Sequence, residues 1–201
     1  MNDFAADLAQ QLLNRSRQTN AEWEARPAAV LVPLYQTEGE WHLLFTERTH
    51  TVEDHKGQVA FPGGRVDEAD RDRIATALRE AEEEIGLPPA QVRVLGVLDE
   101  LLTISLYRVT PVVGVFDWPT RFQISRDELS EVFGVPVRWL ADPANREVQY
   151  REPPPHLPIR SKIPVYYFRY AGHTIWGVTG RIVVNFLEIA QPLLVSERQG
   201  L

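Results

Sequence analysis

The sequence contains no cysteine among its 201 residues. Disulfide bonds, a thiolate nucleophile and a zinc ion held by cysteine are therefore excluded. Positive charge is also in short supply, because 21 lysine and arginine residues stand against 28 aspartate and glutamate residues and leave a formal net charge of −7. This balance disfavours a general nucleic-acid binder, whose binding face needs an excess of lysine and arginine.

Long apolar runs are absent as well. No run reaches the roughly 18–20 residues that a membrane-spanning helix needs. The acidic start, Met1–Phe4, has no apolar h-region of the kind found in secretory signals. We therefore expect a cytoplasmic protein with no membrane partner. Hydrophobic residues make up 44% of the chain, enough for one core, and we expect a single domain over residues 1–201.

Hydrophobic periodicity and turn residues predict an α/β fold. Helices are predicted at 4–17, before Gly86, at 125–133 and at 179–190. Strands are predicted at 28–35, 41–46, 92–97, 108–116, 165–170 and 174–176. Residues 1–26 form an N-terminal helical extension in this interpretation. The five prolines of residues 151–164 predict a loop.

The most informative segment runs from Arg79 to Leu87 and reads R-E-A-E-E-E-I-G-L. At about 100° per residue on a helix, Glu80, Glu83 and Glu84 share one face, opposite an apolar face. Like charges at this spacing destabilise a helix by roughly 0.2–0.5 kcal/mol per pair. A divalent cation would neutralise them, and hard cations such as Mg²⁺ prefer oxygen ligands. The spacing therefore predicts a site for Mg²⁺ or Mn²⁺, although a solvated acidic face is the simpler reading of the triplet alone.

The neighbouring Glu82 points about 100° away from Glu83 on the same helix. We interpret it as a solvent-facing residue despite its place inside the triplet. Asp67 and Asp70 precede the helix, and either one is suited to an outer metal shell, a helix N-terminal charge or a cap.

The segment resembles the Nudix box, G-x5-E-x7-R-E-U-x-E-E-x-G-U, where U is aliphatic. The last nine positions match from Arg79 to Leu87, with Ala81 at the first U. The front half departs from the pattern, because Arg65 and Arg71 stand where glycine and glutamate are expected. With one extra residue allowed, Gly64 takes the glycine position and Asp70 the acidic position.

Four further segments resemble one branch of that family, the coenzyme A pyrophosphatases. They are Leu43–Thr49, Gly57–Gly64, Thr110–Gly114 and Trp176–Thr179. The resemblance extends over about residues 28–190. It implies the Nudix fold, a mixed β-sheet sandwiched between α-helices. It also implies metal-dependent cleavage of the pyrophosphate of coenzyme A or its thioesters, with 3′,5′-ADP and 4′-phosphopantetheine as products.

The same resemblance implies roles for the box residues. The metal ligands would be Glu80, Glu83, Glu84 and the backbone carbonyl of Gly64, with Glu80 serving as a third ligand or as a base. Arg79 would orient a glutamate rather than touch the substrate.

A second acidic group from outside the box often completes such sites, and Glu128 is the best match. An alternative for Glu128 is purely structural, because Ser125-x-x-Glu128 has the form of a capping box at a helix start.

Cations just before the glycine loop are suited to binding phosphates. The proposed substrate contacts are Arg48, His55, Lys56 and Arg65. Glu53 stands where the branch usually carries arginine, which counts against recognition of a 3′-phosphate there. Two alternatives therefore stay open: a Nudix hydrolase for ADP-ribose, NADH or a dinucleoside polyphosphate, and an inactive Nudix-fold module that binds a ligand. The oligomeric state is not readable from the sequence, which is compatible with a homodimer.

Overall fold

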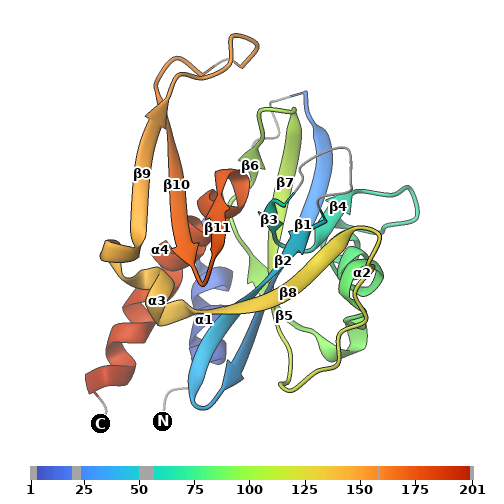
Figure 1. The fold of residues 1–201 in the computed structure, drawn as a ribbon, viewed down its shortest axis with the longest axis vertical. Helices are drawn as coiled ribbons and strands as arrows, with labels where there is room; N and C mark the ends of the chain where they lie inside the picture. The colour runs from blue at the N-terminus through green and yellow to red at the C-terminus, as the bar shows by residue number, and fades with distance from the viewer. Residues whose placement is uncertain (1–3, 20–23, 50–56, 158, 200–201) are drawn as a thin grey trace.

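Two β-sheets and four α-helices make up the described part of the chain in the computed structural model (Figure 1). The structure describes residues 4–19, 24–49, 57–157 and 159–199. The larger sheet has the strand order β3-β2-β1-β7-β5, with β4 paired to β1, β6 to β7 and β8 to β2. The smaller sheet has the order β11-β10-β9. The expected mixed sheet between helices is confirmed.

The strands of the larger sheet are β1 Arg26–Thr37, β2 Glu40–Arg48, β3 Val59–Ala60, β4 Gly63–Arg65, β5 Arg93–Val97, β6 Leu101–Leu102, β7 Tyr107–Val115 and β8 Leu129–Pro136. Those of the smaller sheet are β9 Arg146–Arg151, β10 Ile163–Tyr170 and β11 His173–Trp176. The α-helices are α1 Phe4–Asn14, α2 Arg73–Ile85, α3 Val137–Ala141 and α4 Gly177–Gln199. Two 3₁₀ turns, Pro89–Gln91 and Pro143–Asn145, complete the order.

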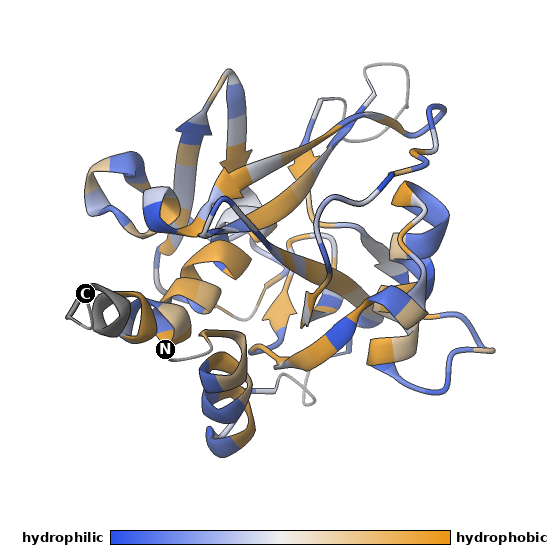
Figure 2. Ribbon diagram, turned by 90° about the horizontal axis from the view of Figure 1, so that it is seen from below, coloured by the Kyte–Doolittle hydropathy of each residue, from blue (hydrophilic) through white to orange (hydrophobic). Residues whose placement is uncertain are grey.

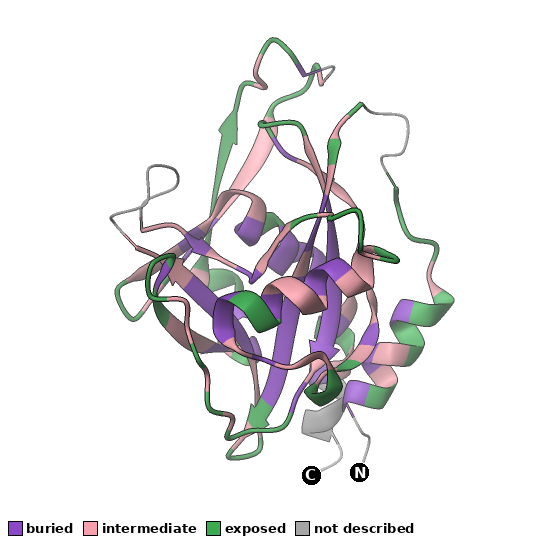
Figure 3. Ribbon diagram, turned by 90° about the vertical axis from the view of Figure 1, so that its right-hand side faces the viewer, coloured by how far each residue is buried: buried purple, intermediate pink, exposed green. Residues whose placement is uncertain are grey.

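Strand β1 lies at the centre because its sequence is apolar on both faces. It runs parallel to β7 and antiparallel to β2. Ala29 and Leu31 pack in the core cluster beneath α2, whereas Ala28 and Val32 belong to the cluster formed with α1 and α4. A strand buried on both sides is typical of a sheet covered by helices on both faces. Figure 2 shows the apolar strands between the helices, and Figure 3 shows α2 lying across buried strands.

The helix predicted at residues 125–133 is wrong. Residues 126–128 form a turn, closed by N–H donation from Glu128 and Leu129 to the Ser125 carbonyl, and β8 follows directly. The capping-box pattern is a local signal for a helix. Here the long-range pairing of β8 with residues His42 to Arg48 of β2 stabilises a strand instead. Glu128 therefore does not cap a helix, and the structural alternative for it is excluded.

Other boundaries differ less. Helix α1 ends at Asn14 rather than at residue 17, and α4 continues past residue 190 to Gln199. Strand β9 was not predicted, because all six of its residues are exposed and only Val148 and Tyr150 are apolar, too short an alternation to indicate a strand. A loop joins β9 and β10 at the tip of a projecting hairpin, but it is shorter than predicted, because Arg151 ends β9 and Ile163 and Pro164 begin β10 (Figure 1). Among the described residues, no helix combines the length and apolar character needed to cross a membrane.

Candidate functional site

Helix α2 has a defined start and end, and these fix the direction of its glutamates. The Asp72 carboxylate accepts a hydrogen bond from the Ala75 N–H at 2.8 Å, which caps the first turn. At the other end Gly86 adopts a left-handed conformation with φ 68°, and its N–H bonds the helix carbonyls. Glycine suits this position because it has no Cβ to clash there. The cap is thus Asp72 rather than Asp67 or Asp70.

The three glutamates on the predicted face differ in exposure. Glu84 is buried, with 7% of its surface exposed. The side chain of Glu80 is 17% exposed and that of Glu83 is 59% exposed. Glu82 is exposed, as its position on the helix predicts. The face therefore leads from a buried carboxylate at Glu84 out to solvent at Glu83.

The glycine loop packs directly against these carboxylates. The Gly63 N–H donates to Glu84 Oε2 at 3.3 Å. A Cβ on Gly64 would lie 2.4–2.6 Å from the carboxyl atoms of Glu80, closer than real Cβ contacts. Strand β4 can therefore approach α2 this closely only because residue 64 has no side chain.

We expect Gly64→Ala to lower kcat by about 10²-fold with little change in Tm, since a displacement near 1 Å in a catalytic group can cost that much. The added methyl group meets the flexible end of Glu80, which can move aside. Gly63→Ala is the matched control, because its Cβ would lie 2.4 Å from the Ala29 carbonyl oxygen and 2.6 Å from the Val30 Cα. Steady-state kinetics and thermal unfolding of both variants check this. Gly63→Ala should unfold at a lower temperature than Gly64→Ala, because its methyl group meets backbone atoms that cannot move aside. Each kcal/mol of lost stability should lower Tm by about 2–4 °C. A lower Tm for Gly64→Ala than for Gly63→Ala would contradict the expectation.

Arg79 joins the acidic groups of the site. Its guanidinium makes two hydrogen bonds of 3.1 Å to the Asp70 carboxylate. Its Nη1 lies 2.9 Å from Glu80 Oε1 and 3.1 Å from Glu83 Oε2. The paired guanidinium is the main reason that the pKa of Asp70 lies well below its usual range. Arg79 therefore contacts two of the glutamates, and Asp70 anchors Arg79.

Burial dominates the electrostatics of the glutamate face. Loss of hydration raises the pKa of Glu84 to about 8, and the nearby Glu80 charge adds to that effect. Burial also raises the pKa of Glu80, against the attraction of Arg79. A carboxylate that is costly to ionise in isolation is one that a cation stabilises. The donor set of three carboxylates fits Mg²⁺ or Mn²⁺, which take oxygen ligands.

We expect Glu84→Gln to stabilise the metal-free protein at high pH. The folded-state pKa of Glu84 lies above its unfolded value, so the folded protein holds an extra proton and its stability falls as pH rises from about 4.5 to about 8. Glutamine removes that dependence. Thermal unfolding in a chelator at about pH 6 and about pH 9 should show a smaller loss of Tm for Glu84→Gln than for wild type. Glu82→Gln, an exposed control, should follow wild type, and parallel curves for all three proteins would contradict the expectation.

Glu128 lies close to the glutamate face. Its charge contributes to the raised pKa of Glu84. The segment that carries it is tied to the end of α2, because the Ser125 N–H donates to the Glu84 carbonyl and the Gln123 N–H to the Ile85 carbonyl, both at 2.9 Å. The structure thus brings the predicted outer acidic residue to the box helix, although a turn and not a helix presents it.

Of the four cations predicted to contact the substrate, the structure describes Arg48 and Arg65, and the two lie in different surroundings. Arg48, at the end of β2, attracts Glu84, and its buried Nε has no hydrogen-bond partner among the described residues. Arg65 is exposed and its guanidinium lies 5.5 Å from the Tyr107 ring centroid. Since Gly64 faces α2, the adjacent Arg65 points to the other face of the sheet. His55 and Lys56 lie outside the described residues.

A pocket of about 440 Å³ lies elsewhere, lined in part by Trp41, Arg93 and Trp118. Gln36 of β1 also lines this pocket. It lies seven residues along β1 from Ala29, which pairs with Gly64 at the glutamate face. At about 3.3 Å per residue the two points are roughly 23 Å apart. The pocket is therefore separate from the glutamate face.

Comparisons with known proteins agree with this geometry. The NUDIX domain family matches residues 25–155. The chain is 40% identical over 186 residues to an uncharacterized Nudix hydrolase, NudL, of Pectobacterium atrosepticum, with 91% of each chain covered. An Escherichia coli K12 protein of the same name is 47% identical over 112 residues, which span 56% of this chain and 58% of that protein.

A solved structure gives the same fold. The MutT/nudix family protein from Enterococcus faecalis superposes with a TM-score of 0.53 at 14% identity, covering 83% of this chain and 62% of that one. The similarity in sequence to the NudL proteins, together with the family match over most of the chain, is sufficient to classify it. The chain belongs to the Nudix hydrolase family.

Proposed function

We propose that this Nudix hydrolase cleaves the pyrophosphate of coenzyme A or its thioesters with Mg²⁺ or Mn²⁺, giving 3′,5′-ADP and 4′-phosphopantetheine or its acyl derivative. The observation that carries the proposal is that two segments resembling the coenzyme A branch, Leu43–Thr49 and Gly57–Gly64, each place a residue beside the box carboxylates. Gly63 bonds Glu84, and Arg48 lies near the same carboxylate. Each of the two segments therefore contributes a residue next to Glu84.

The residues of the site divide the work of hydrolysis. Glu80, Glu83 and Glu84, with Gly64, are the proposed metal-binding groups. When bound, the cations neutralise phosphate charge and activate the attacking water. Arg79 holds Glu80 and Glu83 in position through its bonds to both. The buried Nε of Arg48 can donate to a phosphate oxygen, and such charge-assisted bonds are stronger than neutral ones.

Water adds to one phosphorus atom, the bridging P–O bond breaks, and the proton of the water passes to a carboxylate. Glu80 and Glu128 are the two residues that we propose for this step. Glu128→Gln removes the charge from an exposed turn, so it should leave Tm unchanged. Removing a general base typically costs about 10²–10⁴ in rate. A Glu128→Gln enzyme with wild-type kcat would assign the proton transfer to Glu80.

The substrate is tested by incubating the protein with either cation and coenzyme A, 3′-dephospho-coenzyme A, NADH, ADP-ribose or Ap4A. Mass spectrometry identifies the products. We expect coenzyme A to give the highest kcat/KM and to yield 3′,5′-ADP. Faster turnover of NADH, ADP-ribose or Ap4A would replace the proposal with that substrate.

The preference for the 3′-phosphate should be modest. One charge-assisted contact contributes about 1.5–3 kcal/mol, or roughly ten- to a hundred-fold in kcat/KM. Glu53 repels the same dianion, so we expect a preference near the lower end, about ten-fold. Glu53→Arg should raise it. Equal kcat/KM for both compounds on both proteins would show that the loop before the glycines does not recognise the 3′-phosphate.

The presence of Glu53 also favours the second candidate, a Nudix hydrolase for a nucleoside diphosphate derivative without a 3′-phosphate, such as ADP-ribose, NADH or a dinucleoside polyphosphate. A catalytically inactive binding module is less well supported, because a domain that only binds has no need of the chelating carboxylates.

A further inference from the structure

A second group of metal-ligating side chains lies away from α2. Glu47 of β2, Glu131 of β8 and His173 of β11 each offer a ligand atom, and these atoms lie within 4.8 Å of one another. His173 Nδ1 is 2.7 Å from Glu47 Oε2, and Nε2 is 3.6 Å from Glu131 Oε1. We call these three residues the His–Glu cluster.

The His–Glu cluster is on the opposite face of the larger sheet from the box glutamates. Successive side chains of a strand alternate between faces. Leu43 and Phe45, which alternate with Glu47 along β2, pack in the cluster formed with α1 and α4, whereas Leu44 packs in the cluster beneath α2. Glu47 therefore lies on the face away from α2. Glu131 is the direct partner of Glu47 in the register of β2 and β8 and shares its face. An ion held here would therefore be separate from the one proposed at α2.

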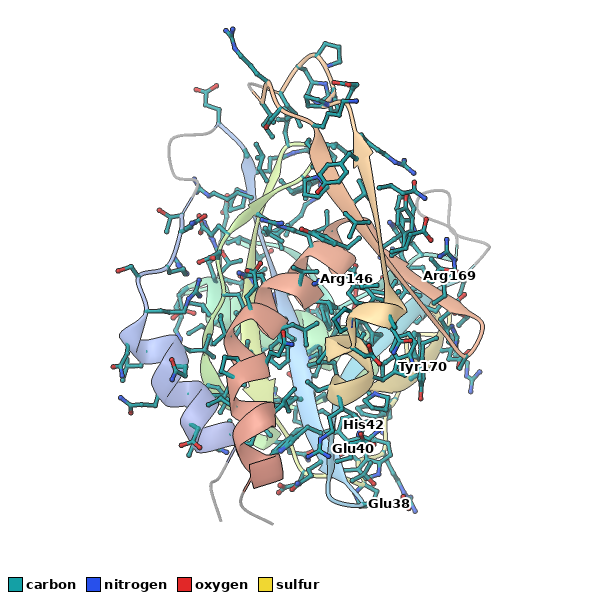
Figure 4. The ribbon with its side chains drawn as sticks, turned by 90° about the vertical axis from the view of Figure 1, so that its left-hand side faces the viewer. Glu38, Glu40, His42, Arg146, Arg169 and Tyr170 are labelled. Atoms are coloured by element: carbon teal, nitrogen blue, oxygen red, sulfur yellow. The ribbon has the colours of Figure 1, made fainter. Side chains whose placement is uncertain are left out.

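The imidazole of His173 is fixed in place by packing. Its ring stacks on Phe133 with centroids 3.8 Å apart and an interplanar angle of 11°. The side chain is 15% exposed. It reaches the larger sheet from the smaller one, just beyond Arg169 and Tyr170, which Figure 4 labels at the end of β10. A ligand held in one orientation loses little freedom when it binds an ion.

The two glutamates also need a positive partner. Like charges directly opposite each other in an antiparallel pair are destabilising. Within the ranges that the structure describes, no arginine or lysine forms an ion pair with Glu47 or Glu131. The nearby cationic candidates are thus a protonated His173 or a bound metal ion.

We propose that the His–Glu cluster binds a divalent transition-metal ion, with Zn²⁺ as the representative, through the two carboxylates and one imidazole nitrogen. Imidazole suits zinc, copper, iron and nickel, whereas all-oxygen sites suit Mg²⁺ and Mn²⁺, so the two faces of the sheet select different metals. Three protein ligands leave a coordination position for water, and the Glu131 side chain is 51% exposed. The ion joins β2 and β8 of the larger sheet to β11 of the smaller one.

The proposal is tested by titrating the metal-free protein with Zn²⁺ in millimolar Mg²⁺, which occupies the oxygen-only carboxylates of α2. Calorimetry gives the stoichiometry and Kd, and Co²⁺ in place of Zn²⁺ gives a visible spectrum that reports nitrogen ligation. We expect one equivalent of Zn²⁺ and a higher Tm in wild type. His173→Gln should weaken Kd by at least about ten-fold, the lower limit seen even for groups that only support a metal ligand.

Two further variants make the test decisive. His156→Gln is the matched control, because His156 is exposed and contacts the Ile104 carbonyl instead. It should bind Zn²⁺ as wild type does. Glu131→Gln changes an exposed side chain, so it reports on the site even if His173→Gln folds poorly. Equal Zn²⁺ binding by wild type, His173→Gln and Glu131→Gln would overturn the proposal, as would an absence of binding by wild type.

Discussion

Replacing Glu83 by glutamine will lower kcat by about 10²–10³, the usual cost of removing one strong electrostatic element from an active site. Glu83 lies on the face that we propose binds metal, and its Oε2 is 3.1 Å from Arg79 Nη1. Replacing its neighbour Glu82 in the same way should leave kcat within a few-fold of wild type. The two residues are adjacent in sequence and both exposed, so they differ mainly in direction.

Steady-state kinetics at saturating Mg²⁺ compares the two variants. Their Tm values should match wild type, because neither side chain is buried. Equal impairment of Glu82→Gln and Glu83→Gln would mean that the direction of the helix face has been assigned wrongly. The proposed ligand set would then have to be redrawn.

Removal of divalent cations with excess chelator should abolish hydrolysis, and either Mg²⁺ or Mn²⁺ should restore it. The reason is electrostatic: Glu80 and Glu84 have raised pKa values through burial, and a diphosphate brings further negative charge to the same face. Among the described residues, the nearby cations are Arg48 and Arg79, and Arg79 is already paired with Asp70 and Glu83. Without metal, this face has no cation to bridge the carboxyl groups and the diphosphate, so the substrate should not bind productively.

The measurement is product formation with stepwise addition of cation to chelated enzyme. Cation affinity should rise when a diphosphate is present, because phosphate oxygens complete the coordination shell. Full turnover in excess chelator would remove the central argument for the role of α2.

Local signals in the sequence account for α2 and its glutamates. The 3.6-residue period, the stop at Gly86 and the separation of Glu82 from Glu83 all depend on residues within one or two turns. The same reasoning fails at residues 125–133, where a four-residue capping pattern indicates a helix but pairing with β2 produces a strand. Strand pairing joins residues far apart in sequence, and no local pattern reports it.

The sequence alone also does not predict which side chains from distant segments come into contact. Asp70 was open to several roles until its two bonds to Arg79 were visible. The His–Glu cluster brings together Glu47 and His173, which are 126 residues apart in the sequence, and no local pattern reports that contact. The proximity of Arg48 to Glu84 follows from the register of β2, which periodicity alone does not fix.

The docking of residues 123–125 on the last turn of α2 has a consequence for how this enzyme can vary. The bonds from Gln123 and Ser125 to the helix carbonyls make the turn bearing Glu128 part of the same rigid unit as the box. Insertions or deletions within residues 117–121, between the buried Phe116 and the partly buried Phe122, would therefore change the surface without altering the spacing of the acidic groups. That stretch is a place where the chain can acquire new substrate contacts while its hydrolytic chemistry stays the same.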